Sequence, residues 1–312
     1  MKAAVRTGGS IRFSACAKAP RKPGTNEVLV SVRAAGINPI DYKLPKLLGG
    51  PVAGLDLAGV AVAVGHGVKG FKEGDEVFGF AKSGSVAEQA LCDGAKLALK
   101  PKELAFTDAA ALPTAYLTSL QALRTHGKLQ AGGSVLVIGA SGGCGLSGVK
   151  LAKALGAAEV VGVTSSKNAE LVKAAGASRT VDYTSEAEMS ALLSEGPTFD
   201  VVYDCATGSG KGEDYVKAAK AVLKPGGVTV AINGKLGDWM RLIFNMQPKG
   251  RKIMLTKQNS AELGELIQLL GTTGIEIDSL HELSEAGVDA AFDRLKSRRA
   301  RGKVVITVME GG

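Results

Sequence analysis

A glycine-rich segment between a strand-like run and a helix-like run constrains this chain most. The apolar run Ser134–Ile138 is followed by a glycine-rich turn and then by a helical pattern through Leu155. In this setting Ala140-x-Gly142-x-x-Gly145 matches a dinucleotide fingerprint that has alanine in its first place. Gly142 would let the backbone approach a pyrophosphate, Gly145 would let the helix pack closely on the strand, and the helix N-terminus would attract the phosphates. The predicted contacts of this turn are Ala140, Ser141, Gly142, Gly143, Cys144 and Gly145.

Strand-like and helix-like segments alternate from about Pro113 onward. Such alternation predicts β–α–β units and a parallel sheet that is covered by helices on both faces. The expected strands after the first are Glu159–Val163, Thr180–Val181, Phe199–Asp204, Gly227–Ala231 and Lys252–Leu255, and the expected helices include Ala169–Ala175 and Tyr215–Leu223.

The first 110 residues are instead rich in short β-type segments bounded by glycine. Glu27–Gly36, Gly59–Gly65 and Gly74–Phe80 predict a compact, barrel-like β domain. The last fifty residues hold two helical patterns and a final strand, Lys303–Val308, which we expect to return to the N-terminal β domain. The fold class is therefore α/β, with residues 1–113 and 259–312 in one domain and residues 114–258 in the other, as a length of 312 residues allows.

The charge of the chain excludes little. Lysine and arginine exceed the acidic residues by 8, but the charges are scattered and aromatic residues make up only 4%. The densest basic run, Ser297–Lys303, is interpreted as a solvated helix end. Because a nucleic-acid platform needs aromatic side chains for base stacking, we expect no nucleic-acid partner.

The cysteines and the N-terminus bear on the compartment. Cys16, Cys92, Cys144 and Cys205 form neither C-x-x-C pairs nor metal-ligand spacings, and a chain of this length needs no disulfide framework. No apolar run reaches about 18 residues, so no membrane span is expected. Met1–Val5 shows no leader pattern. We expect a cytoplasmic protein, with an organellar form after removal of a transit peptide left open.

The residues after the second expected strand bear on the choice of nucleotide. In NAD sites a carboxylate follows the glycines by about 20 residues, but residues 163–168 contain none. Ser165, Ser166 and Lys167 instead suit a 2′-phosphate through charge-assisted hydrogen bonds. NADPH is therefore favoured over NADH. In the alternative interpretation, Ser165 only caps the helix that begins near Asn168, and Lys167 is solvated.

Several ordered motifs now resemble one family over nearly the whole chain: the zinc-free medium-chain dehydrogenase/reductases, in the quinone oxidoreductase and enone reductase branch. The resemblance implies a GroES-like β-rich catalytic domain closed over a Rossmann domain, with the active site in the cleft. The matching segments are Ala34–Lys43, Gly54–Val60, Phe71–Gly79, Leu112–Leu123, the glycine turn and Arg301–Ile306.

The resemblance also bears on zinc. Where zinc-dependent relatives carry cysteine and histidine ligands, this chain has Asn38 and Asp56. The structural zinc lobe is missing too, and His66, His126 and His281 have no partners at ligand spacing. Since zinc needs several thiolate, imidazole or carboxylate ligands, no metal is expected. Each histidine is interpreted as a surface residue.

The resemblance assigns further roles to particular residues. Asn38 would contact the nicotinamide ribose or the substrate carbonyl, and Lys167 and Tyr183 would surround the 2′-phosphate. Tyr42 is either a proton donor or a packing aromatic, the two being about equally favoured. Cys144 and Cys205 are interpreted as small fillers rather than nucleophiles. The expected cofactor contacts also include Thr114, Cys205, Ala206, Ile232, Asn233 and Lys303.

The predicted function is hydride transfer from NADPH to quinones or α,β-unsaturated carbonyls without a metal, as in a quinone oxidoreductase. Two alternatives stay open: an enoyl-thioester or alkenal reductase, and an NADPH-binding module that binds nucleic acid or a partner. A homodimer is expected. The connection from Asp41 to Pro51 is short, and Asp238–Met246, unusually apolar for a loop, is interpreted as a substrate flap or a dimer contact.

Overall fold

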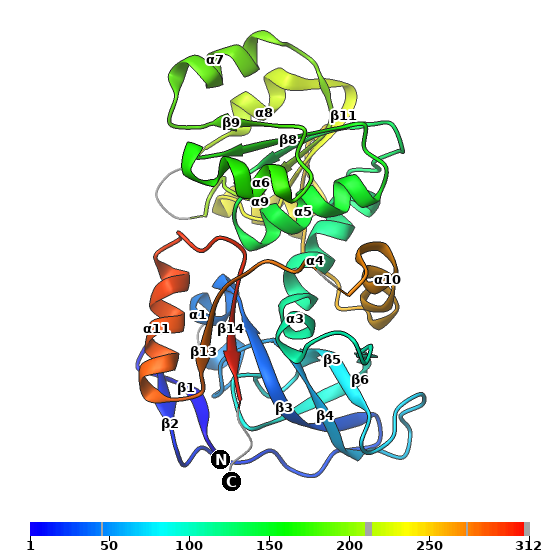
Figure 1. Ribbon diagram of the computed structural model, residues 1–312, viewed down its shortest axis with the longest axis vertical. Coiled ribbons are helices and arrows are strands. Elements are labelled where there is room, and N and C mark those ends of the chain that lie inside the picture. Colours follow the sequence, from blue (N-terminus) through cyan, green and yellow to red (C-terminus); the bar gives the residue numbers. More distant parts are fainter. Residues whose placement is uncertain (45, 210–213, 273, 309–312) are drawn as a thin grey trace. The chain divides into compact units, whose positions relative to one another are not determined.

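The computed structural model describes residues 1–44, 46–209, 214–272 and 274–308 (Figure 1). The chain forms two compact units. The first unit comprises Met1–Leu117 and Gln258–Gly312, and the second comprises Thr118–Lys257. The boundaries predicted after residues 113 and 258 compare with boundaries after residues 117 and 257 in the structure.

The second unit is built on a six-stranded parallel sheet. Its strand order is β12-β11-β10-β7-β8-β9. The first of these strands in the chain, β7, therefore lies in the middle, and the order reverses between β7 and β10, where ligands of doubly wound sheets bind. The strands are β7 (Ser134–Ile138), β8 (Glu159–Thr164), β9 (Arg179–Asp182), β10 (Phe199–Asp204), β11 (Leu223–Ala231) and β12 (Arg251–Ile253).

Helices cover both faces of this sheet, as the strand–helix alternation predicts. Leu136, Ile138 and Val202 belong to a buried cluster that also holds residues of α7 and α8. The opposite face carries Val137 and Tyr203, which lie against α5; in Figure 1, α5 and α6 lie on one side of β8 and β9. The helices are η1 (a π-helical turn, Gln121–His126), α5 (Gly143–Ala154), η2 (a 3₁₀ turn, Ser166–Asn168), α6 (Ala169–Ala174), α7 (Glu186–Ser194), α8 (Val216–Val222) and α9 (Leu236–Ile243).

The first unit has a six-stranded sheet in the order β13-β14-β3-β4-β5-β6, in which β3 also pairs with β6. This extra pairing closes β3, β4, β5 and β6 into a barrel, which confirms the predicted barrel-like domain. A separate hairpin, β1 with β2, lies beside it. The strands are β1 (Ala3–Thr7), β2 (Ser10–Ser14), β3 (Glu27–Ile37), β4 (Asp56–Val64), β5 (Glu76–Ala81), β6 (Gln89–Leu99), β13 (Ile277–Glu282) and β14 (Lys303–Thr307).

The final strand returns to this barrel, as predicted: β14 pairs antiparallel with β3, opposing Val305 to Gly36. The helix α11 packs on β2, β13 and β14, while α3 packs on β3 and β4. The helices of this unit are α1 (Pro39–Lys43), α2 (Lys46–Gly49), α3 (Phe106–Ala111), α10 (Ser260–Leu270) and α11 (Glu285–Lys296), and α4 (Pro113–Leu120) runs across the unit boundary.

The interpretation of Asp238–Met246 as a loop is wrong. Most of this segment is helical, in α9, which ends near Asn245, a residue with a left-handed backbone (φ 53°). Its apolar side chains recur at helical spacing with Asp238 and Arg241 between them, a period that marks an amphipathic helix. Within the described residues, no helix combines the length and apolarity that crossing a membrane requires.

Candidate functional site

The glycine turn of the second unit connects β7 to the N-terminus of α5. A Cβ at Gly145 would clash with the carbonyl oxygen of Gly139, so the close packing of helix on strand requires glycine there. A Cβ at Gly142 would meet only that same oxygen, at 3.7 Å. Gly142 is therefore not needed for packing, and its missing side chain leaves space beside the first N–H groups of α5, where a phosphate can approach.

The residues at the carboxyl end of β8 connect to this turn. Asn168 donates from Nδ2 to the hydroxyls of Ser141, at 3.1 Å, and Ser165, at 3.4 Å. Ser165 precedes η2 without a capping bond from its side chain. Lys167 and Tyr183 are both exposed.

An acidic residue that sequence reasoning missed lies beside Ser166. Asp182 Oδ2 accepts a hydrogen bond from the Ser166 N–H at 2.9 Å. Hydrogen bonds from the backbone and hydroxyl of Thr184 lower the pKa of Asp182 to about 2, so its carboxylate is charged. Asp182 was overlooked because a carboxylate was expected only within residues 163–168. In the structure, the parallel register of β8 and β9 places Asp182 opposite Thr164. A register argument could therefore have found it.

The carboxyl end of β10 forms a tight turn. Asp204 Oδ1 accepts from the backbone N–H groups of Ala206, at 3.0 Å, and Thr207, at 2.9 Å. Burial raises the pKa of the Cys205 thiol well above its usual range, so that thiol stays protonated. The backbone carbonyl of Cys144 accepts from the Ser147 hydroxyl at 3.1 Å.

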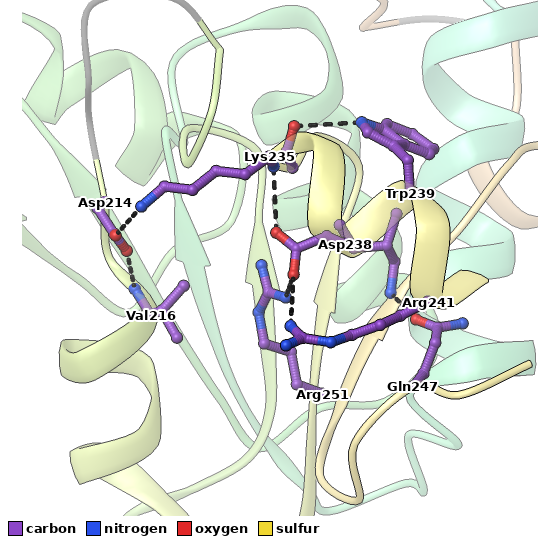
Figure 2. Close-up of polar contacts among 10 residues, drawn as sticks. Asp214, Val216, Lys235, Asp238, Trp239, Arg241, Gln247 and Arg251 are labelled. Carbon is purple, nitrogen blue, oxygen red and sulfur yellow. Dashed lines mark hydrogen bonds and ion pairs between the residues drawn. The ribbon is translucent and has the colours of Figure 1, made fainter. Parts of the chain in front are cut away.

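The turn after β11 is held by the start of α9. The Ile232 N–H donates to the Asp204 carbonyl, which keeps the ends of β11 and β10 together. Figure 2 shows the rest of the network. Trp239 donates from its indole to the Gly234 carbonyl at 3.1 Å, and Asp238 Oδ2 accepts from the Lys235 N–H at 3.1 Å. The carboxylate of Asp238 also accepts from Arg251 at 2.8 Å, and Lys235 pairs with Asp214 at 3.0 Å. The backbone is thus bonded at Ile232 and at Gly234, on either side of Asn233; Ile232 and Asn233 are the two cofactor contacts expected in this turn.

The first unit holds a buried polar chain. Asn38 Oδ1 accepts from the Lys303 ammonium at 2.5 Å, and Asn38 Nδ2 donates to Asp56 Oδ2 at 2.9 Å. Lys303 also lies 3.5 Å from Asp56 Oδ2. All three residues are at most 5% exposed. The Asn38 amide is thus held at both ends, in one orientation, between a cation and a carboxylate.

Asp56 has further donors on the other side. Thr114 donates its hydroxyl to Asp56 Oδ1 and its N–H to Oδ2 at 3.1 Å. Burial nevertheless raises the pKa of Asp56, while Lys303 and the hydrogen bonds from Thr114 and Asn38 oppose that rise. The described ranges contain no cluster of three histidine, cysteine or acidic side chains suited to a metal ion. With both oxygens engaged and a lysine at 3.5 Å, Asp56 does not fit the role of a zinc ligand.

Asp41 is the second buried carboxyl of this cluster. Its Oδ2 accepts from the Asn38 N–H at 2.7 Å. Burial, and then the charge of nearby Asp56, raise the pKa of Asp41 to about 7. Tyr42, the next residue on α1, is half-buried against the core of the first unit, and burial raises the pKa of its phenol. Of the three histidines that were expected at the surface, His66 is exposed, and His126 and His281 are half-buried.

Two family descriptions match the chain. Residues 24–119 match an alcohol dehydrogenase GroES-like domain, and residues 175–306 match a zinc-binding dehydrogenase. Among curated proteins, the 2-methylene-furan-3-one reductase of Solanum lycopersicum is 37% identical over 300 residues, which cover 90% of this chain and 71% of that protein. The chloroplast envelope quinone oxidoreductase homolog of Arabidopsis thaliana is 31% identical over 312 residues, covering 91% and 90%.

The chain belongs to the medium-chain dehydrogenase/reductase family, in its quinone oxidoreductase branch. Among solved structures, the quinone oxidoreductase from Coxiella burnetii has a TM-score of 0.82 at 28% identity, with 99% of this chain and 98% of that chain covered. This medium-chain reductase is therefore an oxidoreductase with a GroES-like unit and a Rossmann unit of the type that binds a nicotinamide cofactor.

Proposed function

We propose that this reductase transfers hydride from NADPH to quinones and α,β-unsaturated carbonyls without a metal ion. The observation that carries the proposal is the buried Lys303–Asn38–Asp56 chain, in which the two residues at the expected zinc-ligand positions, Asn38 and Asp56, bond to each other and to a lysine. The proposal has three parts: the nucleotide, the absence of zinc and the class of acceptor.

The second unit fits a dinucleotide. The space at Gly142 and the N-terminus of α5 suit a pyrophosphate. The backbone bonds at Ile232 and Gly234 and the small side chains of Cys205 and Ala206 suit the nicotinamide half. When bound, the reduced nicotinamide supplies a hydride; the protein's part is to hold and orient it.

The preference for NADPH rests on Lys167 and Tyr183. Both are exposed, and they follow the carboxyl ends of β8 and β9 in the chain, as Ser165 follows β8. A cation and two hydroxyls suit a phosphate dianion. The charged Asp182 opposes this preference, although its carboxylate oxygens already accept hydrogen bonds from Ser166 and Thr184. We expect the protein to prefer NADPH over NADH, but by a smaller affinity ratio than Lys167 would give without Asp182 nearby.

The class of acceptor follows from the proposal that the reaction uses no metal ion. An acceptor that spreads its developing charge by conjugation needs orientation and exclusion of water more than metal activation. Asn38 Nδ2 bears two hydrogens and gives one to Asp56, which leaves the other for an acceptor oxygen. Because Lys303 and Asp56 fix the amide, Asn38 would orient the acceptor without reorganising.

The names of two relatives support the choice between acceptors. One is called a furan-3-one reductase and the other a quinone oxidoreductase homolog, which are both conjugated carbonyl classes. Enoyl thioesters are the second candidate, since they are conjugated in the same way. The NADPH-binding module without an activity is disfavoured by the ordered polar chain at Asn38, which a pure binding module has no need to build.

A steady-state assay of NADPH oxidation tests the proposal. The panel holds a quinone, an alkenal, an enone, crotonyl-CoA and a saturated ketone, each measured with and without a zinc chelator. The proposal expects turnover with the conjugated acceptors, little with the saturated ketone, and no effect of the chelator. Equal turnover with the saturated ketone, or loss of activity on chelation with recovery on adding zinc, would contradict it.

Lys167→Ala tests the cofactor part. The variant should weaken NADPH binding about tenfold or more, since one charge-assisted hydrogen bond contributes roughly 1.5–3 kcal/mol. NADH binding should hardly change. Lys173→Ala, which removes a lysine on α6 that pairs with Glu170 at 3.1 Å, is the matched control. Equal weakening of both nucleotides in calorimetry would rule out the 2′-phosphate assignment.

The predicted homodimer finds support at the edge of the Rossmann sheet. The strand β12 is at that edge, and the end of α9 and the residues after it carry Ile243 (71% exposed), Phe244 (62%) and Met246 (69%). Such neighbouring apolar side chains mark an association surface. The cytoplasmic location remains a prediction.

A further inference from the structure

Arg6 is a buried arginine that the proposed chemistry does not use. It lies on β1 and is only 8% exposed. Its Nη1 donates to the carbonyl oxygens of Gly49 at 2.6 Å, Gly50 at 3.1 Å and Val52 at 2.6 Å. Its Nη2 donates to the carbonyl oxygen of Asp41 at 2.8 Å. The two hydrogens of Nη1 thus serve three acceptors, one hydrogen being shared, and the side chain contacts four backbone carbonyls in all.

These acceptors come from both ends of one segment. Asp41 belongs to α1, while Gly49 ends α2 and Val52 follows it. The backbone N–H of Arg6 also donates to the Pro51 carbonyl at 2.8 Å. A cation at the carboxyl ends of helices is placed favourably against their carbonyl dipoles. The hairpin strand β1 thus holds the segment 41–52 at its beginning and at its end.

The backbone around Arg6 is shaped to admit a guanidinium. A Cβ at Gly49 would lie 2.9 Å from Cζ and 3.0 Å from Nη2 of Arg6, so a side chain at that position would displace the guanidinium. A lysine could not replace the arginine, because its ammonium is a single point with three donors and cannot reach acceptors spread around a planar fork.

The segment that Arg6 holds is directly connected to Asn38. Asp41 accepts from the Asn38 N–H through Oδ2 at 2.7 Å, and its own N–H donates to the Asn38 carbonyl at 2.9 Å. Any shift of Asp41 therefore shifts Asn38, whose amide lies between Lys303 and Asp56.

We propose that Arg6 is a positioning residue of the acceptor site: by holding both ends of the segment 41–52, it fixes Asp41 and, through Asp41, Asn38. This inference rests on the proposed function in so far as Asn38 orients the acceptor. We call the hydrogen bonds of Arg6 to Asp41 and to residues 49–52 the clamp. The clamp lies within the first unit, so its effect can be measured without any enzymatic turnover.

Three variants separate the clamp from the charge. Arg6→Met removes both, and Arg6→Lys keeps the charge but loses the fork. Gly49→Ala leaves the arginine in the sequence, but its methyl group should push the guanidinium out of place. This variant tests the same contacts if Arg6→Met does not fold. Arg12→Met is the matched control, because Arg12 lies on the neighbouring strand β2, is 64% exposed and touches Asp289 only at 3.5 Å.

Amide hydrogen exchange of the whole protein is the first measurement. Exchange of residues 46–52 should become about tenfold faster or more in Arg6→Met and in Gly49→Ala. It should remain as in the wild type in Arg12→Met, as should exchange of the Rossmann sheet in every variant. Unchanged exchange in both Arg6→Met and Gly49→Ala would overturn the clamp.

Kinetics with a quinone or an enone is the second measurement. KM for the acceptor should rise about tenfold in Arg6→Met and Gly49→Ala and should be only partly restored in Arg6→Lys, while Kd for NADPH is unchanged. Faster exchange with an unchanged acceptor KM would overturn the positioning role. If no variant and no wild-type protein reduces any conjugated acceptor, the proposed function fails; the exchange result then still decides whether the clamp exists.

The pH profile is the third measurement. Asp41 is faced by Asp56 from β4, Lys303 from β14, Arg6 from β1 and the Asn38 N–H. Burial and then the charge of Asp56 raise the pKa of Asp41, whereas the Asn38 N–H, Lys303 and Arg6 lower it. The alkaline shift of the acceptor KM profile expected in Arg6→Met should therefore be absent in Arg6→Lys. A shift of equal size in both variants would contradict this division of roles.

Discussion

Asp41 and Asp56 are two carboxyls buried in one cluster with Lys303, and they do not hold their protons equally. Asp56 accepts from Asn38 and Thr114 and lies beside the lysine, so it is the better placed to carry the negative charge. Asp41, next to that charge, has a pKa of about 7. Near neutral pH the cluster therefore exchanges one proton at Asp41.

The stability of the protein should depend on this proton. An unfolded aspartate has a pKa of about 3.9, so between about pH 4 and pH 7 the folded chain binds one more proton than the unfolded chain. The stabilisation is fully present below about pH 4 and is lost as pH rises toward 7. Asp41→Asn should remove this loss. The unfolding free energy of the variant, relative to that of the wild type, should therefore be roughly 3 kcal/mol higher at about pH 7 than at about pH 4.

Urea denaturation of the wild type and Asp41→Asn across this range measures the effect. Their difference cancels the contribution of half-buried His126, whose pKa burial lowers. A difference in unfolding free energy that stays constant with pH would show that Asp41 is ionised throughout.

Lys303 and Asp56 should be strongly coupled. Lys303→Met leaves a buried carboxylate without its cation and should cost about 3–5 kcal/mol of unfolding free energy. Adding Asp56→Asn should recover a large part, because no buried charge is then left unpaired. A double-mutant cycle by chemical denaturation checks this. Additive losses would mean that the ion pair contributes nothing to the fold.

At the scale of elements, the glycine turn between β7 and α5 could be predicted because its chemistry is local. The spacing of the glycines predicted that Gly145 allows close packing and that Gly142 faces the ligand. The clash that a Cβ at Gly145 would cause agrees with the packing role. Asp182 could not be found in the same way. It approaches Ser166 only because β8 and β9 pair, and such pairing is a tertiary fact.

Gly142→Ala and Gly145→Ala make a matched pair of tests. Gly142 has a φ of −79°, which alanine adopts freely, and open space at its Cβ, so its variant should unfold as the wild type does. It should still bind NADPH about tenfold more weakly, a cost of ~1.4 kcal/mol, because the methyl group occupies the approach of the pyrophosphate. Gly145→Ala should destabilise the fold itself. Calorimetric binding and thermal unfolding distinguish the two; normal NADPH binding by Gly142→Ala would place the phosphates elsewhere.

For the whole molecule, the sequence predicted the two-part α/β architecture and the return of the final strand, since both follow from patterns of apolar residues. It missed β6, which holds no β-branched or aromatic residue and includes alanine, aspartate, glycine and lysine, all of low strand propensity; β6 pairs with β3 and β5. It also missed α9 as a helix. The buried chain at Asn38 was foreseen only in part, because Asp41 and Arg6 carry no motif and come together through the fold.

The association surface of α9 can be tested at this scale. Phe244→Asp places a charge among exposed apolar side chains, which should separate a dimer into monomers without lowering the melting temperature, since Phe244 is 62% exposed. Sedimentation velocity of the wild type and the variant reads this directly. A wild type that is monomeric at micromolar concentration would contradict the predicted homodimer.

The central claim is that hydride reaches the conjugated carbon of the acceptor rather than a carbonyl carbon activated by metal. The most direct measurement uses NADPH deuterated at C4 on the transferred face, an enone as acceptor, and mass spectrometry with NMR of the product. The account predicts a saturated ketone that carries one deuterium on its β-carbon, at the same yield with a zinc chelator present. An alcohol with deuterium on the former carbonyl carbon would contradict it.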